Sequence, residues 1–480
     1  MSGLSAAMAT AAGALEAYDR VLEVTQNNVD NANTPGYAAQ TQTLEALPFD
    51  LNSGALGGVS AGEVVSARDQ YSEQAVRSAT TALGAANQNL QSLTSVQSVF
   101  DVTGNSGLPY ALNNLFQSFS AWAQSPTGTV ERQSVLDQAS AVASAFQQTA
   151  AQLGQVRQGV ETQLQQTVDA VNQLTAQLAA LNQQVAAGGQ NDAGLDAQVT
   201  STLETLSQYV DITASKQSDG ATTVLLNGQA PLVMGTSAYQ LTYQLAEPQD
   251  PPPDYPQGPP SASIFSGDND VTSQITTGSL GALLDVENRV IPSYLGNAYQ
   301  PGNLNTMAQQ FADYVNQTLT SGDIDDRNPP QAGVAIFTYD TSNGADVAAT
   351  MAVDPTVTSD QLAAIDPGPP PVANGIALQL AALANPQSSD GEIENVSYTE
   401  YFGQMASSVG AELSAATDNQ QTQQSTVAQA QDLRQQTSGV SLDEEAMTLV
   451  QFQRAYEANS HLITILDELT EDAINMLLLT

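Results

Sequence analysis

The side chains that most often perform catalysis or bind metals are scarce in this sequence. There is no cysteine, and His461 is the only histidine. We therefore expect neither a Ser-His-Asp triad nor a multi-histidine metal site within one chain, and disulfides and thiolate ligands are excluded. His461 lies in a periodic apolar segment near the C-terminus, where we expect it on the polar face or at an interface of a helix. These residues predict no catalytic, metal or cofactor site.

Charged residues could also bind phosphates or cations, but their spacing does not favour this. The only lysine, Lys216, does not follow the glycine-rich pattern of a phosphate loop. Two acidic clusters, at residues 268–270 and 323–326, lack the loop glycine and the distal glutamate of a calcium motif, so we interpret them as solvated loops. A carboxylate pair suited to glycoside hydrolysis stays open as an alternative. With 50 acidic residues in the chain, the sequence can neither exclude nor locate such a pair.

The charge balance narrows the classes of partner. The 480 residues carry 50 acidic and 10 basic side chains, a formal charge of −40, so a basic face for nucleic acid is not expected. The N-terminus has no basic region before an apolar block, and no run of about 18 apolar residues occurs, so we expect neither a secretory signal peptide nor a membrane span. The chain should be soluble, either cytoplasmic or exported without a cleaved signal, with roughly two to four domains.

The shortage of basic residues also supports a hypothesis about the environment. In acid, carboxylates lose their charge while arginine and lysine keep theirs, so a chain with few bases repels itself less at low pH. An acidic exterior is one interpretation of this composition, and chance lineage bias is the other.

Apolar residues at the N-terminus form a narrow seam along a predicted helix. They step by four and three residues, as one face of a helix requires: Leu4, Met8, Ala11, Leu15, Tyr18 and Leu22. The seam ends in NNVDNANTPGY, residues 27–37, where asparagine side chains compete with helical pairing and Pro35-Gly36 turns the chain. We call residues 27–37 the joint and predict that it sets the angle of the terminal helix. The resemblance described below implies that five joint residues contribute to an assembly interface: Asn28, Asn33, Pro35, Gly36 and Tyr37.

A second seam lies at the C-terminus. Ser441 and Glu444 have capping-box spacing, and the acidic residues that follow Leu442 suit a helix N-terminus. The apolar positions behind this cap are Leu442, Ala446, Leu449, Tyr456, Ile463, Leu466, Leu469, Ala473 and Met476. Neither seam is wide enough to be well buried alone. The two together predict an antiparallel pair of terminal helices, which also serves as an assembly interface.

Between the seams, periodicity predicts a body of long helices. The longest signal covers residues 130–187, with heptad spacing and two glycines, Gly154 and Gly159, that could kink it. An aromatic helix at 112–122 should form core. Further helical segments are predicted over 69–100, 280–284, 304–319, 376–383 and 398–413.

Residues 209–245 alternate as strands do, and three dipeptides mark hairpin turns: Asp219-Gly220, Asn227-Gly228 and Met234-Gly235. The proline-rich run 247–260 is interpreted as an exposed connector, the alternative being a ligand for a proline-binding domain. Short strands are expected at 334–339 and 348–353. The predicted fold class is mainly α with a smaller β-rich part. The predicted domains are 1–37 with 438–480 (terminal helices), 38–205 with 374–437 and 280–320 (helical core), 206–279 (β-rich outer domain) and 321–373 (irregular insert).

These segments resemble a known family. The joint resembles the N-terminal motif of the flagellar rod, hook and hook-associated axial proteins, and residues 438–469 resemble their C-terminal motif. The interior is more specific, because four segments resemble the helical core of the FlgK family of hook-associated proteins. They are residues 109–139, 174–185, 202–235 and 275–292.

This resemblance implies a structural role rather than an enzyme. Such proteins form a ring-like junction between hook and filament, so the implied partners are copies of the chain, the hook protein, a second junction protein and the filament. The resemblance also implies export through the flagellar type III channel to the cell exterior, with a chaperone of the FlgN type on the C-terminal segment. The terminal helices would form the inner coiled-coil layer of the assembly and be disordered in the free monomer.

Two alternatives stay open. Another axial protein is the nearer one, although the long core helices argue against hook protein and the joint argues against flagellin. A secreted coiled-coil adhesin or surface enzyme is the alternative from a different class, and glycan binding by residues 205–275 would favour it.

Overall fold

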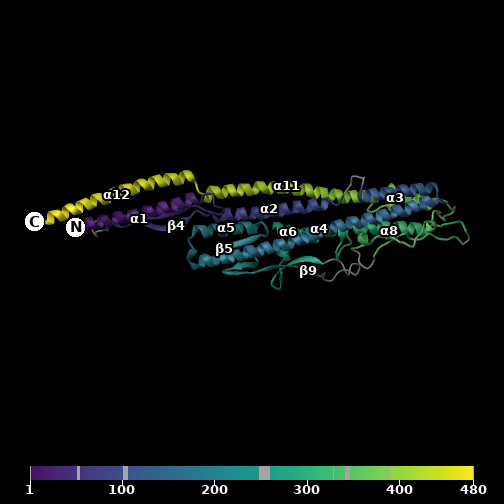
Figure 1. The fold of residues 1–480 in the computed structure, drawn as a ribbon, viewed down its shortest axis with the longest axis horizontal. Coiled ribbons are helices and arrows are strands. Elements are labelled where there is room, and N and C mark those ends of the chain that lie inside the picture. Colours follow the sequence, from purple (N-terminus) through teal and green to yellow (C-terminus); the bar gives the residue numbers. More distant parts are fainter. Residues whose placement is uncertain are drawn as a thin grey trace. The chain divides into compact units, whose positions relative to one another are not determined.

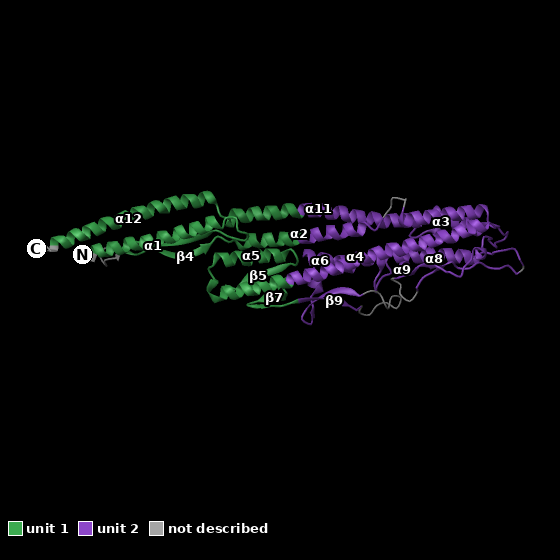
Figure 2. Ribbon diagram, in the orientation of Figure 1, with its two compact units in different colours: residues 1–83, 172–240, 423–480 green, residues 84–171, 241–422 purple. Residues whose placement is uncertain are grey.

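Long helices carry most of the fold. The computed structural model describes residues 2–50, 55–100, 106–247, 260–327, 329–340, 346–387 and 389–478. The chain divides into two units (Figure 2): unit 1 contains Met1–Leu83, Asn172–Gln240 and Gln423–Thr480, and unit 2 contains Gly84–Val171 and Leu241–Thr422. Three helices contribute residues to both units: α2 (Gln70–Gln97), α4 (Thr129–Gln184) and α11 (Tyr398–Ser438). The predicted fold class, mainly α with a smaller β-rich part, is confirmed.

The terminal helices pair in unit 1. Helix α1 (Ser2–Asp30) packs on α12 (Leu442–Leu478) and on an antiparallel ribbon of β1 (Gln40–Ala46) and β4 (Val59–Ser66) (Figure 1). The side chain of Asn28 bonds Glu445, whereas the rings of Tyr18 and Phe452 lie 5.6 Å apart. Residue numbers therefore fall along α1 as they rise along α12, which confirms the predicted antiparallel pair. At the far end of the ribbon, β2 (Phe49–Asp50) pairs with β3 (Ala55–Leu56).

The rest of unit 1 contains a helix and a four-stranded sheet. Helix α5 (Ala193–Ser207) precedes β5 (Ile212–Lys216), β6 (Thr222–Leu226), β7 (Ala230–Met234) and β8 (Ser237–Ala238), which pair in sequence order. The three predicted hairpin turns are confirmed. In the second turn Asn227 and Gly228 both have positive φ, 46° and 70°, as a type I′ turn requires. Asn182 of α4 holds this sheet through its amide, which bonds the backbone of Thr222 at 2.8 Å in both directions.

An aromatic cluster forms the core of unit 2. Phe311 lies at its centre, with ring centroids 6.4 Å from Phe116, 6.4 Å from Phe146 and 5.2 Å from Tyr398. The predicted core residues of the 112–122 helix are all buried: Leu112, Leu115, Phe116, Phe119 and Trp122. The other elements of unit 2 are α3 (Gly107–Gln124), α6 (Gly278–Asp285), α7 (Ile291–Leu295), α8 (Asn303–Ser321), α9 (Val347–Thr350), α10 (Gly375–Ala381), β9 (Leu241–Ala246), β10 (Ser261–Ser266), β11 (Asn269–Asp270), β12 (Phe337–Thr338) and β13 (Ala352–Val353).

Some local predictions differ from the structure. Helix α4 continues through both predicted kink points and ends near Gly188, whose φ of 124° leaves the helical region. Helix α5 was not predicted as a separate element. The strand predicted over 348–353 is largely wrong, because α9 occupies its first half and only Ala352–Val353 is extended. The strands within 206–279 form two separate sheets, β5–β8 in unit 1 and β9–β11 in unit 2. Of the proline-rich run, residues 248–259 lie outside the described part of the chain.

Candidate assembly interface

Asn28 connects the end of α1 to two other elements. Its side chain is 1% exposed, and its Nδ2 donates to the Gln40 carbonyl at 2.8 Å and to Glu445 Oε1 at 2.7 Å. Its Oδ1 accepts from the Gln40 amide and from the Tyr37 hydroxyl, both at 2.9 Å. An unsatisfied buried polar group costs about 1–3 kcal/mol, so an asparagine with all of these bonds made holds α1 against both β1 and α12.

Tyr37 bonds the last residue of the joint back to its first two residues. Its hydroxyl lies 2.9 Å from the Oδ1 atoms of both Asn27 and Asn28 and donates to them. Burial, followed by the nearby Glu445 carboxylate, raises the pKa of Tyr37 to about 12, so this hydroxyl stays a donor at neutral pH. Burial also raises the pKa of Glu445, although hydrogen bonds from Asn28 and Thr25 oppose this rise.

Gly36 allows the joint to touch the body of unit 1. Its φ is +75°, and a Cβ at this position would lie 2.5 Å from the Ala197 carbonyl oxygen of α5. Its own carbonyl accepts from Arg68 Nη2 at 2.7 Å. Arg68 is fixed in turn by Glu73 at 2.6 Å and Asp196 at 2.7 Å. Both the positive φ and the close approach require glycine here.

The chain entering α12 is bonded to the chain leaving α1. Ser438, the last residue of α11, is buried; its carbonyl accepts from the Ala39 amide at 2.9 Å, and its Oγ accepts from the Asp69 amide at 3.0 Å. At the start of α12, Ser441 Oγ accepts from the Glu444 amide at 3.4 Å, which is the serine half of the predicted capping box. The C-terminal end of α1 and the N-terminal end of α12 therefore share one hydrogen-bonded base.

The buried stripe of α1 consists mainly of small residues and lies beside the predicted seam, with which it shares Ala11. The seam residues Leu4, Met8, Leu15, Tyr18 and Leu22 are half-buried at its edge. The residues of the stripe itself are Ala11, Ala14, Ala17, Val21, Thr25 and Asn28. Asn33 and Pro35 are exposed on the surface of the joint. The larger apolar residues of α1 therefore keep part of their surface available to another molecule.

Helix α12 exposes far more apolar surface. Along the described residues 442–476 no side chain is fully buried. Leu449, Ile463 and Leu466 of the predicted seam are half-buried, whereas Leu442 and Tyr456 are exposed. Six large apolar residues, 45–71% exposed, fall within about a third of the helix circumference at 3.6 residues per turn. Two of them, Leu469 and Met476, belong to the predicted seam. We call these six residues the outer stripe: Met447, Val450, Leu462, Ile465, Leu469 and Met476.

Comparisons with known proteins identify the family of this chain. The model of the flagellar hook-associated protein FlgK helical domain matches residues 93–337, just over half of the chain. The chain belongs to the FlgK family of flagellar hook-associated proteins. The C-terminal model of flagellar basal body rod FlgEFG proteins matches residues 421–476, and the flagella basal body rod protein model matches residues 8–37. The chain is therefore a structural component of the bacterial flagellum.

Individual relatives agree with this family assignment. The chain is 27% identical to flagellar hook-associated protein 1 of Bacillus subtilis (strain 168), over 97% of each protein. Its fold is similar to that of the flagellar hook junction protein FlgK from Burkholderia pseudomallei, with a TM-score of 0.62 at 16% identity, covering 77% of this chain and all of the other.

The remaining chemistry-bearing residues do not gather into a site. His461 is exposed on α12. Asp270 caps a turn by accepting from the Thr272 amide at 2.8 Å, and Asp325 pairs with Arg327, whose hydrogen bond lowers the pKa of that exposed carboxyl. Within the described ranges, no group of three His, Cys, Asp or Glu side chains could hold a metal ion. Nor does any described helix have the length and hydropathy to cross a membrane.

Sequence reasoning identified the joint of this FlgK-family chain but missed the residues that hold it. Arg68, Ser438 and Glu445 contact the joint from distant parts of the sequence. The one signal that could have indicated a cluster is the rarity of basic residues: four of the ten, Arg68, Arg77, Lys216 and Arg434, lie in unit 1 around Glu73, Asp196 and Glu204.

Proposed function

We propose that the chain assembles with copies of itself through its terminal helices, as a ring-like junction between hook and filament. The observation that carries this proposal is the outer stripe of α12, which exposes six large apolar side chains along one helix face. Full burial of one such side chain contributes about 1.5–3 kcal/mol. Large apolar side chains exposed on one helix face favour an interaction site, and repeated burial between copies would offset the cost of ordering the helix.

The face of α1 fits the same role. Leu4, Leu15 and Leu22 stay half-exposed beside the contact with α12, so the antiparallel pair presents apolar residues of both helices. The joint bonds α1 and α12 to one base in unit 1. This base would set the orientation of the two helices as they become ordered on assembly.

The proposed partners follow from the family and from the names of its members. The Burkholderia relative is called a hook junction protein, which supports hook protein on one side and a second junction protein and the filament on the other. We propose an extracellular location reached without a cleaved signal, and a chaperone of the FlgN type that covers the C-terminal segment before export. The role is structural rather than catalytic.

Complementation of a deletion strain tests this function. Loss of the chain should leave hooks without filaments and release flagellin into the medium, and the unaltered chain should restore both filaments and swimming. A chain with Met447→Glu and Ile465→Glu should fail, because each substitution places a charge on the outer stripe. Val130→Glu is the matched control, since Val130 is 76% exposed on α4 and outside the terminal pair. Normal filaments in the deletion strain would contradict the proposal.

The chaperone is tested separately. A purified FlgN-type chaperone should bind the full chain and lose that binding when residues 442–478 are removed. Equal binding to both forms would show that α12 is not its site.

A further inference from the structure

A pocket within unit 1 combines charged side chains with apolar ones. It lies between α2, α5 and β5 and has a volume of about 460 Å³. Val199 and Leu203 of α5 are buried where they line it, whereas Tyr71 of α2 is 86% exposed. Three basic and two acidic side chains also line this pocket, which we call the basic pocket: Arg68, Arg77, Lys216, Glu73 and Asp196.

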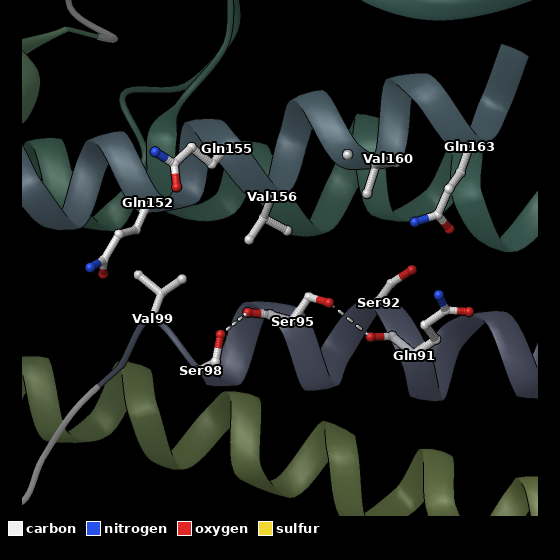
Figure 3. Close-up of a pocket in the computed structure, with 11 residues that line it drawn as sticks. Gln91, Ser92, Ser95, Ser98, Val99, Gln152, Gln155, Val156, Val160 and Gln163 are labelled. Carbon is white, nitrogen blue, oxygen red and sulfur yellow. Dashed lines mark hydrogen bonds between the residues drawn. The ribbon is translucent and has the colours of Figure 1, made fainter.

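The charge of this lining is unusual for the chain. The whole sequence has 50 acidic and 10 basic side chains, yet the described residues that line the basic pocket carry a surplus of one positive charge. A groove of similar volume, about 470 Å³, lies between α2 and α4 within unit 2 (Figure 3), and no charged side chain of the described residues lines it. Of the two, the basic pocket is therefore the one that attracts an anion at short range.

The two carboxylates of the basic pocket already have basic partners. Glu73 pairs with Arg68 at 2.6 Å and with Arg434 at 3.5 Å. Asp196 pairs with Arg68 at 2.7 Å and with Lys216 at 3.4 Å. Neither carboxylate is therefore left to neutralise the remaining basic side chain of the pocket.

That remaining side chain is Arg77, which makes no ion pair with any described residue. Its Nη2 donates to the Gln74 side chain at 3.0 Å, and its Nε is buried without a hydrogen-bond partner in the described part of the chain. Burial lowers the pKa of Arg77, and the more distant carboxylates of Glu73 and Glu204 oppose this only in part. A partly buried guanidinium gains most from a carboxylate that binds it through charge-assisted hydrogen bonds.

We propose that the basic pocket binds a carboxylate group carried on a short aliphatic stem. The carboxylate would pair with Arg77, and Lys216, whose side chain is 48% exposed, would be a second donor in the same pocket. The stem would pack on Val199 and Leu203. One surplus positive charge matches a singly charged carboxylate, whereas a phosphate dianion would add a second negative charge beside the two carboxylates of the pocket.

Two sources could supply this group: a free aliphatic carboxylate, or a glutamate side chain of a second copy of the chain. The second source rests on the self-assembly proposed above, whereas the pocket itself does not. A glutamate of a neighbouring copy would add a contact outside the paired terminal helices.

Butyrate is the probe for the pocket, because it carries one carboxylate on a short aliphatic stem. Saturation-transfer NMR should detect butyrate on the full chain but not butyramide, which has the same stem without the charge. Binding should weaken several-fold in Arg77→Gln and less in Arg77→Lys, which keeps the charge but loses the planar fork. Arg289→Gln is the matched control, because Arg289 is exposed in unit 2. Circular dichroism verifies that each variant is folded. Equal binding to the unaltered chain and Arg77→Gln, or no butyrate binding, would overturn the proposal.

Assembly distinguishes the two sources. If a glutamate of a second copy occupies the pocket, Arg77→Gln should raise the concentration needed for assembly several-fold, and butyrate should compete with assembly of the unaltered chain. Arg289→Gln should assemble normally. If a free carboxylate is the ligand, Arg77→Gln should lose butyrate binding and still assemble as the unaltered chain does. An unaltered chain that binds butyrate but never self-associates would contradict the proposed function and support the pocket.

Discussion

Helices α4 and α12 both carry apolar residues at helical spacing, but they differ in burial. Along α4 the apolar positions Val142, Phe146, Leu153, Leu164 and Val171 are completely buried. Along the described part of α12 no apolar position is, and its outer stripe is 45–71% exposed. Periodicity predicts a helix with an apolar face, but it does not tell whether the covering partner belongs to the same chain. The difference fits our proposal that the outer stripe of α12 is covered by another molecule.

Core truncation should produce the largest contrast between the two regions. Phe311→Ala removes the central ring of the unit 2 core and should lower the free energy of unfolding by about 3–5 kcal/mol. Ile465→Ala on the outer stripe should change it by less than about 0.5 kcal/mol, because exposed side chains lose little on truncation. The measurement is urea unfolding of the monomer, followed for both variants by the helix signal in circular dichroism. For Phe311→Ala it is also followed by the fluorescence of Trp122, the only tryptophan, which is fully buried in unit 2. A loss above about 2 kcal/mol for Ile465→Ala would show that the outer stripe is packed within the monomer and would contradict this comparison.

The stability of unit 2 should depend on pH because of Glu287. Its side chain is fully buried, Arg157 Nε donates to its Oε1 at 2.6 Å, and its Oε2 has no hydrogen-bond partner among the described residues. Burial raises the pKa of Glu287 from 4.5 to about 7, and Arg157 opposes the rise. The folded chain thus holds a proton that the unfolded chain has released. This contribution to stability is complete below pH 4.5 and is lost as the pH rises through 7.

The expected size of this pH effect is about 3 kcal/mol. Urea unfolding between pH 4.5 and 7.5, followed by Trp122 fluorescence, should show the decrease. Glu287→Gln should flatten it, whereas Asp169→Asn, at an exposed site on α4, should not. An unchanged slope in Glu287→Gln would assign the dependence to other groups. Greater stability in acid would also fit the hypothesis that the low content of basic residues suits an acidic exterior.

A substitution in the joint should lower stability by less than the two changes in unit 2. Asn28→Ala leaves the Gln40 backbone and Glu445 without their partner and should cost about 1–3 kcal/mol. The loss should appear as release of the terminal pair, seen by limited proteolysis of α1 and α12, with Trp122 unfolding unchanged. Asn33→Ala is the matched control, because Asn33 is exposed in the same segment. Equal proteolysis of the two variants would show that the joint does not depend on the buried amide.

Much of this architecture could be predicted because the relevant signals are local. Periodicity located α4 and α12, and Asn227-Gly228 marked its hairpin through the backbone geometry that this pair permits. The joint was found because proline, glycine and asparagine each restrict the chain within a few residues. Tertiary partners were not found. Glu445 and Ser438 reach the joint from the far end of the sequence, and no local rule links them to Asn28.

The predicted seam of α1 illustrates the same limit. The pattern favoured Leu15 and Leu22 as the packed face, because large apolar residues dominate any count of periodicity. In the structure the closest packing uses Ala14 and Ala17, since small residues let α1 approach its neighbours. The larger side chains stay at the edge, where another subunit can use them.

Amide hydrogen exchange most directly tests whether the partner of α12 lies outside the chain. The full chain is compared as monomer and as assembly, with exchange followed separately in α4 and α12. We predict slow exchange in α4 in both states, and fast exchange in α12 that becomes many-fold slower on assembly. Slow exchange of α12 in the monomer, unchanged by assembly, would contradict the account.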